Sequence, residues 1–269
     1  MTQRLAATCP HDCPSACALQ VERIDSHTIG AVYGNKEQTY TQGVICAKVA
    51  RYKDRIHHPD RLTQPLLRTG KKGVGMAAFS PISWDQALQM MVEKFTHVAD
   101  KYGAEAIWPY HYAGTMGLVQ RDSIDRLSHS LGYSRQQSTI CTSLPDAGYI
   151  AGTGLKRGLD PREIEHATLV VTWGGNPVHT QINVMHHVNK GKKNNQAKLV
   201  VIDPYRTATA QKSALHLMLK PGTDGALACA VMHCLFRDNY ADWDYLNQYT
   251  DDPRGLEQHL ATRTPTWAR

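Results

Sequence analysis

The chain has 269 residues, enough for one large domain or two modest ones, and its 42% hydrophobic and 20% charged residues are typical of a soluble globular protein. Its apolar stretches, such as residues 169–173 and 199–202, are far shorter than the roughly 20 residues of a transmembrane helix, so we expect no membrane insertion. The formal net charge of +6 comes from scattered Lys and Arg residues, and we therefore expect no nucleic acid partner.

The amino-terminal segment has neither a twin-arginine pair nor a long apolar core. It therefore lacks the pattern of an export signal, and we expect a cytoplasmic location. Residues 1–62 show little helical periodicity, but alternation over 18–24 and 29–33 predicts a small sheet. A proline-punctuated connector follows over residues 55–65.

The pattern changes from Ser83 onward, where a capping box with Gln86 predicts a helix that ends at Gly103. Short strands and helices then alternate. We expect strands at 104–110, 169–173 (buried), 198–203 and 215–219, and helices at 118–131, 178–190 and 223–238. This order predicts an α/β fold with a mostly parallel, doubly wound sheet covered on both faces. We expect two domains, a small β-rich domain at 1–62 and the α/β domain at 63–269.

Four of the seven cysteines, Cys9, Cys13, Cys17 and Cys46, lie in the first 46 residues. Three are closely spaced and one is distant, and four thiolates can ligate a [4Fe–4S] cluster with one sulfur for each iron. A structural zinc site is the main alternative, although such sites favour two tight pairs of ligands. Thiols without a metal are the third reading. The odd total argues against a disulfide framework.

The quartet, with Lys48 two residues beyond Cys46, resembles the cluster domain that opens many molybdenum and tungsten enzymes of the DMSO reductase family. The resemblance implies that Lys48 lies on the electron route between the cluster and a pterin. Without the resemblance, Lys48 would be read as a surface lysine.

Cys141 lies in a loop-like segment with Ala147 and Gly148 six and seven residues later. Family members place their protein ligand to molybdenum in such a segment, so the resemblance implies that Cys141 is that ligand. A soft thiolate suits a metal already held by dithiolenes. The alternative is a buried thiol.

Two further segments resemble the family's cofactor cradle. Glycines after a strand and before a helix let backbone amides approach phosphate. Relatives also carry an Asp-Pro-Arg-x-Thr segment and a Pro-Gly-Thr-Asp turn that contact guanosine, and here Tyr205 separates Pro204 from Arg206. Asp224 has a second reading as a helix-capping or first-turn carboxylate. The residues that the resemblance assigns to the cofactor are Gly174, Gly175, Asn176, Asp203, Arg206, Thr207, Thr223 and Asp224.

The resemblance implies an N-terminal portion of a catalytic subunit. Its function would be two-electron oxidoreductase chemistry at a molybdenum bis(molybdopterin guanine dinucleotide), with electrons passing through the [4Fe–4S] cluster. Its expected partners are a small-molecule substrate and an electron-transfer protein or the remaining C-terminal part of the enzyme. The alternatives are a non-catalytic iron–sulfur electron-transfer module without molybdenum and a zinc-stabilised α/β scaffold.

Overall fold

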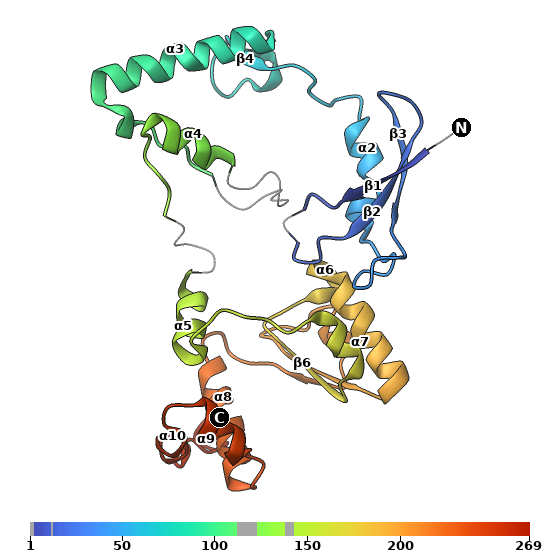
Figure 1. Cartoon of the computed structure of the whole chain (residues 1–269), viewed down its shortest axis with the longest axis vertical. Helices are drawn as coiled ribbons and strands as arrows, with labels where there is room; N and C mark the ends of the chain where they lie inside the picture. Colours follow the sequence, from blue (N-terminus) through green and yellow to red (C-terminus); the bar gives the residue numbers. More distant parts are fainter. Residues whose placement is uncertain (1–2, 12, 112–122, 138–142) are drawn as a thin grey trace. The chain divides into compact units, whose positions relative to one another are not determined.

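The computed structural model describes residues 3–11, 13–111, 123–137 and 143–269 (Figure 1). The chain divides into two compact units, and each unit contains two separate segments of the chain. The first unit comprises Met1–Glu163 and Thr180–His187, and the second comprises Ile164–His179 and Val188–Arg269.

The first unit opens with a three-stranded antiparallel sheet in the order β1-β2-β3 (Figure 1). Its strands are β1 (Gln3–Thr8), β2 (Ala18–Arg23) and β3 (Ile29–Gly34). The alternation that predicted β2 and β3 is confirmed, because Leu19 and Val32 are buried in a small core with Val49. Strand β1 was not predicted, and all six of its residues are exposed.

The rest of the first unit consists of one long helix and a series of shorter elements. They are α1 (Ala47–Ala50), α2 (Tyr52–Ile56), β4 (Leu66–Arg68), η1 (Gly75–Ala78), β5 (Phe79–Pro81), α3 (Trp84–Tyr102), η2 (Ala104–Ala106), α4 (Ser123–Leu131), α5 (Ser143–Thr153) and η3 (Pro161–His166). Strands β4 and β5 pair antiparallel. The predicted capping box of α3 is confirmed, since Ser83 and Gln86 each accept the other's backbone N–H.

The strand expected at 104–110 is wrong. Gly103, with φ of 87°, ends α3, and the chain turns at once into the 3₁₀ helix η2. The backbone N–H groups of Ala106 and Ile107 donate back to Gly103 and Ala104, so they are consumed locally. A segment whose donors close such a turn cannot pair with a neighbouring strand.

The second unit is built on a three-stranded parallel sheet in the order β6-β7-β8. Its strands are β6 (Leu169–Trp173), β7 (Lys198–Ile202) and β8 (Leu215–Leu217). The mixed α/β class with a small antiparallel sheet and a parallel sheet is thus confirmed. The predicted burial of β6 is wrong, because β6 lies at the sheet edge and Leu169, Val171 and Trp173 are exposed. Strand β7, in the middle, supplies the buried Leu199 and Val201.

The helix expected over 178–190 is two helices, α6 (Pro177–Thr180) and α7 (Ile182–Asn195). The last part of the chain forms α8 (Asp224–Arg237), α9 (Trp243–Tyr249) and α10 (Pro253–Leu260), and a fourth 3₁₀ helix, η4 (Ala210–Lys212), precedes β8. Helices α9 and α10 were not predicted. Their N-caps, Asp242 and Asp252, accept hydrogen bonds from the backbone N–H of Tyr245 and Gly255. In the described part of the chain, no helix is both long and apolar enough to cross a bilayer.

Candidate functional site

Three of the four amino-terminal cysteines lie on the loop that joins β1 to β2. Cys9 follows β1 directly, Cys17 precedes β2, and the Cys9 N–H donates to the Cys17 carbonyl at 2.9 Å, which closes the loop. The Ala16 N–H donates to the Cys13 carbonyl and tightens the turn between them. The antiparallel register therefore brings Cys9 and Cys17 together at one end of the sheet.

The fourth cysteine, Cys46, is the residue before α1 and returns to this end of the sheet through the 35–45 loop. A side chain at Gly34 would collide with the backbone of Gly43, so the loop folds back because both positions lack a Cβ. Cys46 packs against the same small core that contains Cys9 and Cys17. The structure thus places Cys46 against the core that contains Cys9 and Cys17, and the binding of a cluster by the four cysteines stays a prediction.

The pKa values of Cys9 and Cys17 are both raised, and nearby thiols contribute to each shift. Burial raises the pKa of Cys9, a backbone hydrogen bond from His11 opposes this, and negative charge on Cys46 and Cys13 raises it further. Burial likewise raises the pKa of Cys17; a hydrogen bond from Asn183 opposes this, and the other three thiols raise it. Without a metal, both thiols therefore hold their protons more tightly than an ordinary cysteine.

Four thiols are the donor set that a cubane cluster takes, with one sulfur for each iron. A single zinc ion would instead need sulfurs drawn to about 2.3 Å of one point. Among the residues that the structure describes, no group of three or more His, Cys, Asp or Glu side chains is placed to hold one metal ion.

Residues 180–187 contact the cysteine loop within the first unit. The side-chain amide of Asn183 donates to Cys17 Sγ at 3.1 Å, and Cys13 Sγ donates to the Thr180 carbonyl at 3.2 Å. Ser15, between the two cysteines, is buried with its Oγ 3.5 Å from the Tyr40 hydroxyl. Neither Asn183 nor Tyr40 was singled out from the sequence, because no local pattern marks a residue so far along the chain as a neighbour.

Lys48 is the second residue of α1 and its side chain is exposed. It is two positions beyond Cys46 in the sequence, and Cys46 is the residue that precedes α1. Its role on the electron route stays a prediction.

A second group of predicted residues meets at the carboxyl end of the parallel sheet in the second unit. Gly174 follows β6 with φ of 63°, and its N–H donates to the Ile202 carbonyl at the end of β7. Gly175 and Asn176 continue this turn. Asn176 Oδ1 accepts from the fully buried Thr209 hydroxyl at 2.7 Å, and Thr209 in turn accepts from the Val178 N–H at 3.2 Å.

The segment after β7 supplies Asp203, Arg206 and Thr207. Asp203 is buried and its Oδ1 accepts from the Tyr205 N–H at 3.2 Å. Thr207 is buried as well, and its hydroxyl accepts from the Ala210 N–H at 3.0 Å. Arg206 is exposed. The extra residue Tyr205 therefore leaves the arginine outward and the threonine inside the turn.

The third segment, Thr223 and Asp224, begins α8. Thr223 is the N-cap residue, and its hydroxyl donates to the Lys220 carbonyl at 2.7 Å rather than capping the helix through its side chain. Asp224 lies in the first turn and accepts from the Trp173 indole at 2.6 Å. This bond ties the start of α8 to the end of β6. The first-turn reading of Asp224 is confirmed, and its contact with a nucleotide stays a prediction.

Comparisons with protein families show which family the chain belongs to. Residues 2–58 match the model described as the molybdopterin oxidoreductase Fe4S4 domain, and residues 61–249 match the molybdopterin oxidoreductase model. The chain belongs to the molybdopterin oxidoreductase family. The DMSO-reductase-type resemblance seen in the sequence is confirmed.

The curated relatives are longer than this chain, which matches part of their length. It is 36% identical over 260 residues to "Probable oxidoreductase YoaE" of Bacillus subtilis (strain 168), covering 96% of this chain and 38% of the relative. It is 31% identical to "Probable dimethyl sulfoxide reductase chain YnfF" of Escherichia coli (strain K12), covering 90% of this chain and 31% of the relative. The chain thus spans about a third of the length of these molybdopterin oxidoreductase relatives.

A solved structure shares the fold. Acetylene hydratase from Pelobacter acetylenicus superposes with a TM-score of 0.69 at 21% identity, over 98% of this chain and 36% of that chain. At this identity the likeness concerns the molybdopterin oxidoreductase fold alone. It carries no reaction from one protein to the other.

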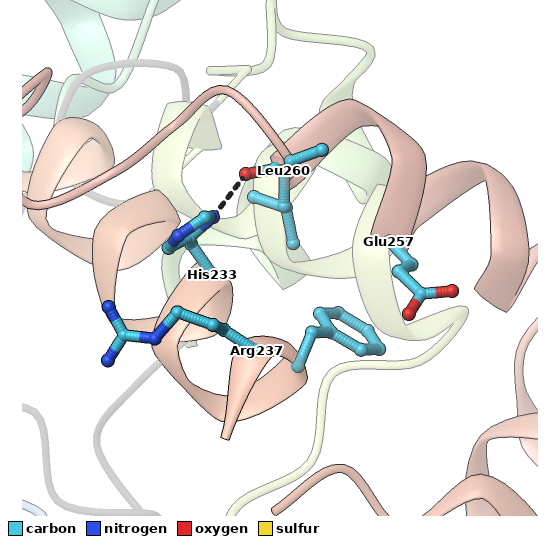
Figure 2. Close-up of a pocket in the computed structure, with 6 residues that line it drawn as sticks. His233, Arg237, Glu257 and Leu260 are labelled. Atoms are coloured by element: carbon cyan, nitrogen blue, oxygen red, sulfur yellow. Dashed lines mark hydrogen bonds between the residues drawn. The ribbon is translucent and has the colours of Figure 1, made fainter. Parts of the chain in front are cut away.

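Cys141, expected to ligate molybdenum, lies outside the described residues, while Ala147 and Gly148 lie on α5. A surface pocket between α8 and α10 is lined by His233, Arg237, Glu257 and apolar neighbours, and His233 Nδ1 lies 2.9 Å from the Leu260 carbonyl (Figure 2). None of the residues assigned to the cofactor lines this pocket.

Proposed function

We propose that the chain is the N-terminal portion of a molybdenum- and [4Fe–4S]-dependent oxidoreductase catalytic subunit. Cys9, Cys13, Cys17 and Cys46 would hold the cluster, and the carboxyl edge of the parallel sheet would hold a molybdopterin guanine dinucleotide. The observation that carries the proposal is that Cys9 and Cys17 lie in one small core, with Cys46 packed against it, in the segment that matches the Fe4S4 domain. The molybdopterin match follows directly along the chain.

The residues present fit the cluster. Two of the four sulfur-bearing residues, Cys9 and Cys17, are buried, which limits the access of water to a bound cluster. Asn183 already offers an N–H to one of the sulfurs. The hydrogen bond from Cys13 to the Thr180 carbonyl needs the thiol proton, so this hydrogen bond would be lost when Cys13 binds iron as a thiolate.

The residues at the sheet edge fit an anionic nucleotide. Gly174 and Gly175 expose backbone at a strand end where ligands bind in parallel sheets. The exposed Arg206 guanidinium can pair with a phosphate. The carboxylates of Asp203 and Asp224 suit ribose hydroxyls or a guanine edge, and the Trp173 indole and the Tyr205 N–H already orient them.

When bound, the molybdenum centre would supply exchange of an oxo group or a hydride equivalent with the substrate, a two-electron reaction. Cys141 would contribute a thiolate ligand to the metal. The ammonium group of Lys48 would lie beside the anionic cluster, on the route by which electrons pass to or from a partner protein. The remaining polar residues of the sheet edge would fix the cofactor in position.

Anaerobic purification followed by analysis of iron, acid-labile sulfide, zinc and molybdenum tests the proposal. We expect about four irons and four sulfides per chain, the content of one cubane cluster. Molybdenum bound together with the guanine dinucleotide, after production in cells that make this cofactor, would support the catalytic reading. A cluster in a protein that never takes up molybdenum would favour the electron-transfer module instead. Zinc without sulfide would overturn both.

A further inference from the structure

Asn183 is a fully buried residue that touches the cysteine loop. It is the second residue of α7, its exposed fraction is 0%, and its side-chain Nδ2 lies 3.1 Å from Cys17 Sγ. The contact joins residues 166 positions apart, so the fold and not local sequence creates it.

The geometry fixes which way the amide faces. Nδ2 can only donate, and a cysteine sulfur can accept. Within the described residues, the buried Oδ1 of Asn183 has no hydrogen-bond partner. The orientation of this amide therefore depends on its bond to the sulfur, and the amide presents its N–H to Cys17.

This bond suits a sulfur that has lost its proton. An anionic sulfur accepts a hydrogen bond more strongly than a neutral thiol, so the Asn183 donation would persist in the ligated state. The neighbouring bond from Cys13 to the Thr180 carbonyl differs, because there the sulfur is the donor and ligation removes its proton. Asn183 is thus built for the thiolate form of the loop.

A donor aimed at a ligand sulfur favours the reduced cluster, which carries one more negative charge than the oxidised cluster. The start of α7, a 14-residue helix, acts in the same direction, because the N-terminal turn of a helix carries partial positive charge.

We propose that Asn183 is a positioning residue that raises the reduction potential of the cluster by donating a hydrogen bond to the Cys17 ligand sulfur. The proposal rests on the proposed function, since it requires a cluster on these four thiols. It concerns the ease of electron entry rather than the reaction with substrate.

An EPR-monitored redox titration of the cluster tests it, with N183L as the first variant. Leucine has a similar volume and no donor. We expect the equilibrium constant for one-electron reduction to fall about tenfold, equivalent to a decrease of ~59 mV in potential. N183Q keeps an amide donor and should restore part of the loss.

N195L is the matched control. Asn195 lies on the same helix and also donates through its side-chain amide, but to the Glu165 carbonyl at 2.6 Å. Its replacement should leave the potential unchanged. An N183L protein with full iron and sulfide content and an unchanged potential would overturn the proposal. A wild-type chain without iron and sulfide would instead refute the proposed function.

A second measurement needs no substitution of Asn183 and covers the case in which N183L loses the cluster. Wild-type protein labelled with ¹⁵N at the asparagine side-chain amides is reduced and studied by pulsed EPR. We expect a ¹⁵N coupling to the cluster spin that is retained in N195L. A loaded, reduced cluster without this coupling would contradict the proposal.

Discussion

The side chains that surround the cysteine loop are held by partners distant in sequence. His187 is fully buried, its Nε2 lies 2.7 Å from the Tyr40 carbonyl, and its ring stacks on the Tyr40 ring at 5.5 Å. Asn183, one helical turn earlier, reaches Cys17. Spacing of the cysteines predicted the ligands, but it could not predict these neighbours, because each depends on where α7 packs.

The ion pair between Arg162 and Asp160 in the first unit predicts a pH-dependent contribution to stability. Hydrogen bonds from the Arg162 guanidinium and backbone, together with its charge, lower the pKa of Asp160 to about 2, and the same guanidinium donates to Thr39 Oγ1 at 2.9 Å. In R162Q, we expect the pKa of Asp160 to rise toward the ordinary ~3.9. Carboxyl NMR titration would measure this change.

The sign follows from the lowered pKa. Whatever stability Asp160 contributes is present above the unfolded value of ~3.9 and is lost as the pH falls toward about 2. R237Q is the control, since Arg237 forms a similar pair with Asp238 elsewhere. An Asp160 pKa that stays near 2 in R162Q would show that Arg162 is not the cause.

Sequence periodicity predicted which helices and strands form better than it predicted which of their side chains are buried. The capped helix α3 begins and ends where its sequence signals lie, yet Leu88, Met91 and Val92 on it are exposed. Strand β6 forms as expected but lies at an edge. The strand expected at 104–110 does not form. Its apolar residues suit a strand, but the backbone N–H groups of Ala106 and Ile107 donate to the carbonyls of Gly103 and Ala104 in η2. Helices α9 and α10 were missed although Asp242 and Asp252 are recognisable caps.

The hydroxyl of Thr209 is expected to stabilise the turn that follows β6. Thr209 donates to Asn176 and accepts from the Val178 N–H, and it is fully buried. T209V keeps the shape of the side chain but removes the hydroxyl that makes both hydrogen bonds, which we expect to lower the free energy of unfolding by about 1–3 kcal/mol. Denaturant unfolding measures it, with T209S as the control that retains the hydroxyl. Equal stability of T209V and T209S would contradict this role.

At the scale of the whole molecule, each unit carries one of the two predicted sites. The first unit holds the cysteine loop with Cys46 and Asn183, and the second holds the sheet edge after β6 and β7. The order of these sites along the chain could be predicted from the cysteine spacing and the strand–turn–helix pattern. Their hydrogen-bond partners could not, since these follow from tertiary packing.

In the proposed cluster site, Cys46 completes a four-thiol set with Cys9, Cys13 and Cys17. Iron and sulfide analysis of C46S tests whether Cys46 is a ligand. C229S is the control, because Cys229 is a free cysteine on α8 in the other unit. We expect C229S to retain about four irons and four sulfides per chain, and C46S to lose the cluster or keep one missing an iron. A C46S protein with the full iron and sulfide content and the unchanged spectrum of a cubane cluster would show that Cys46 is not a ligand.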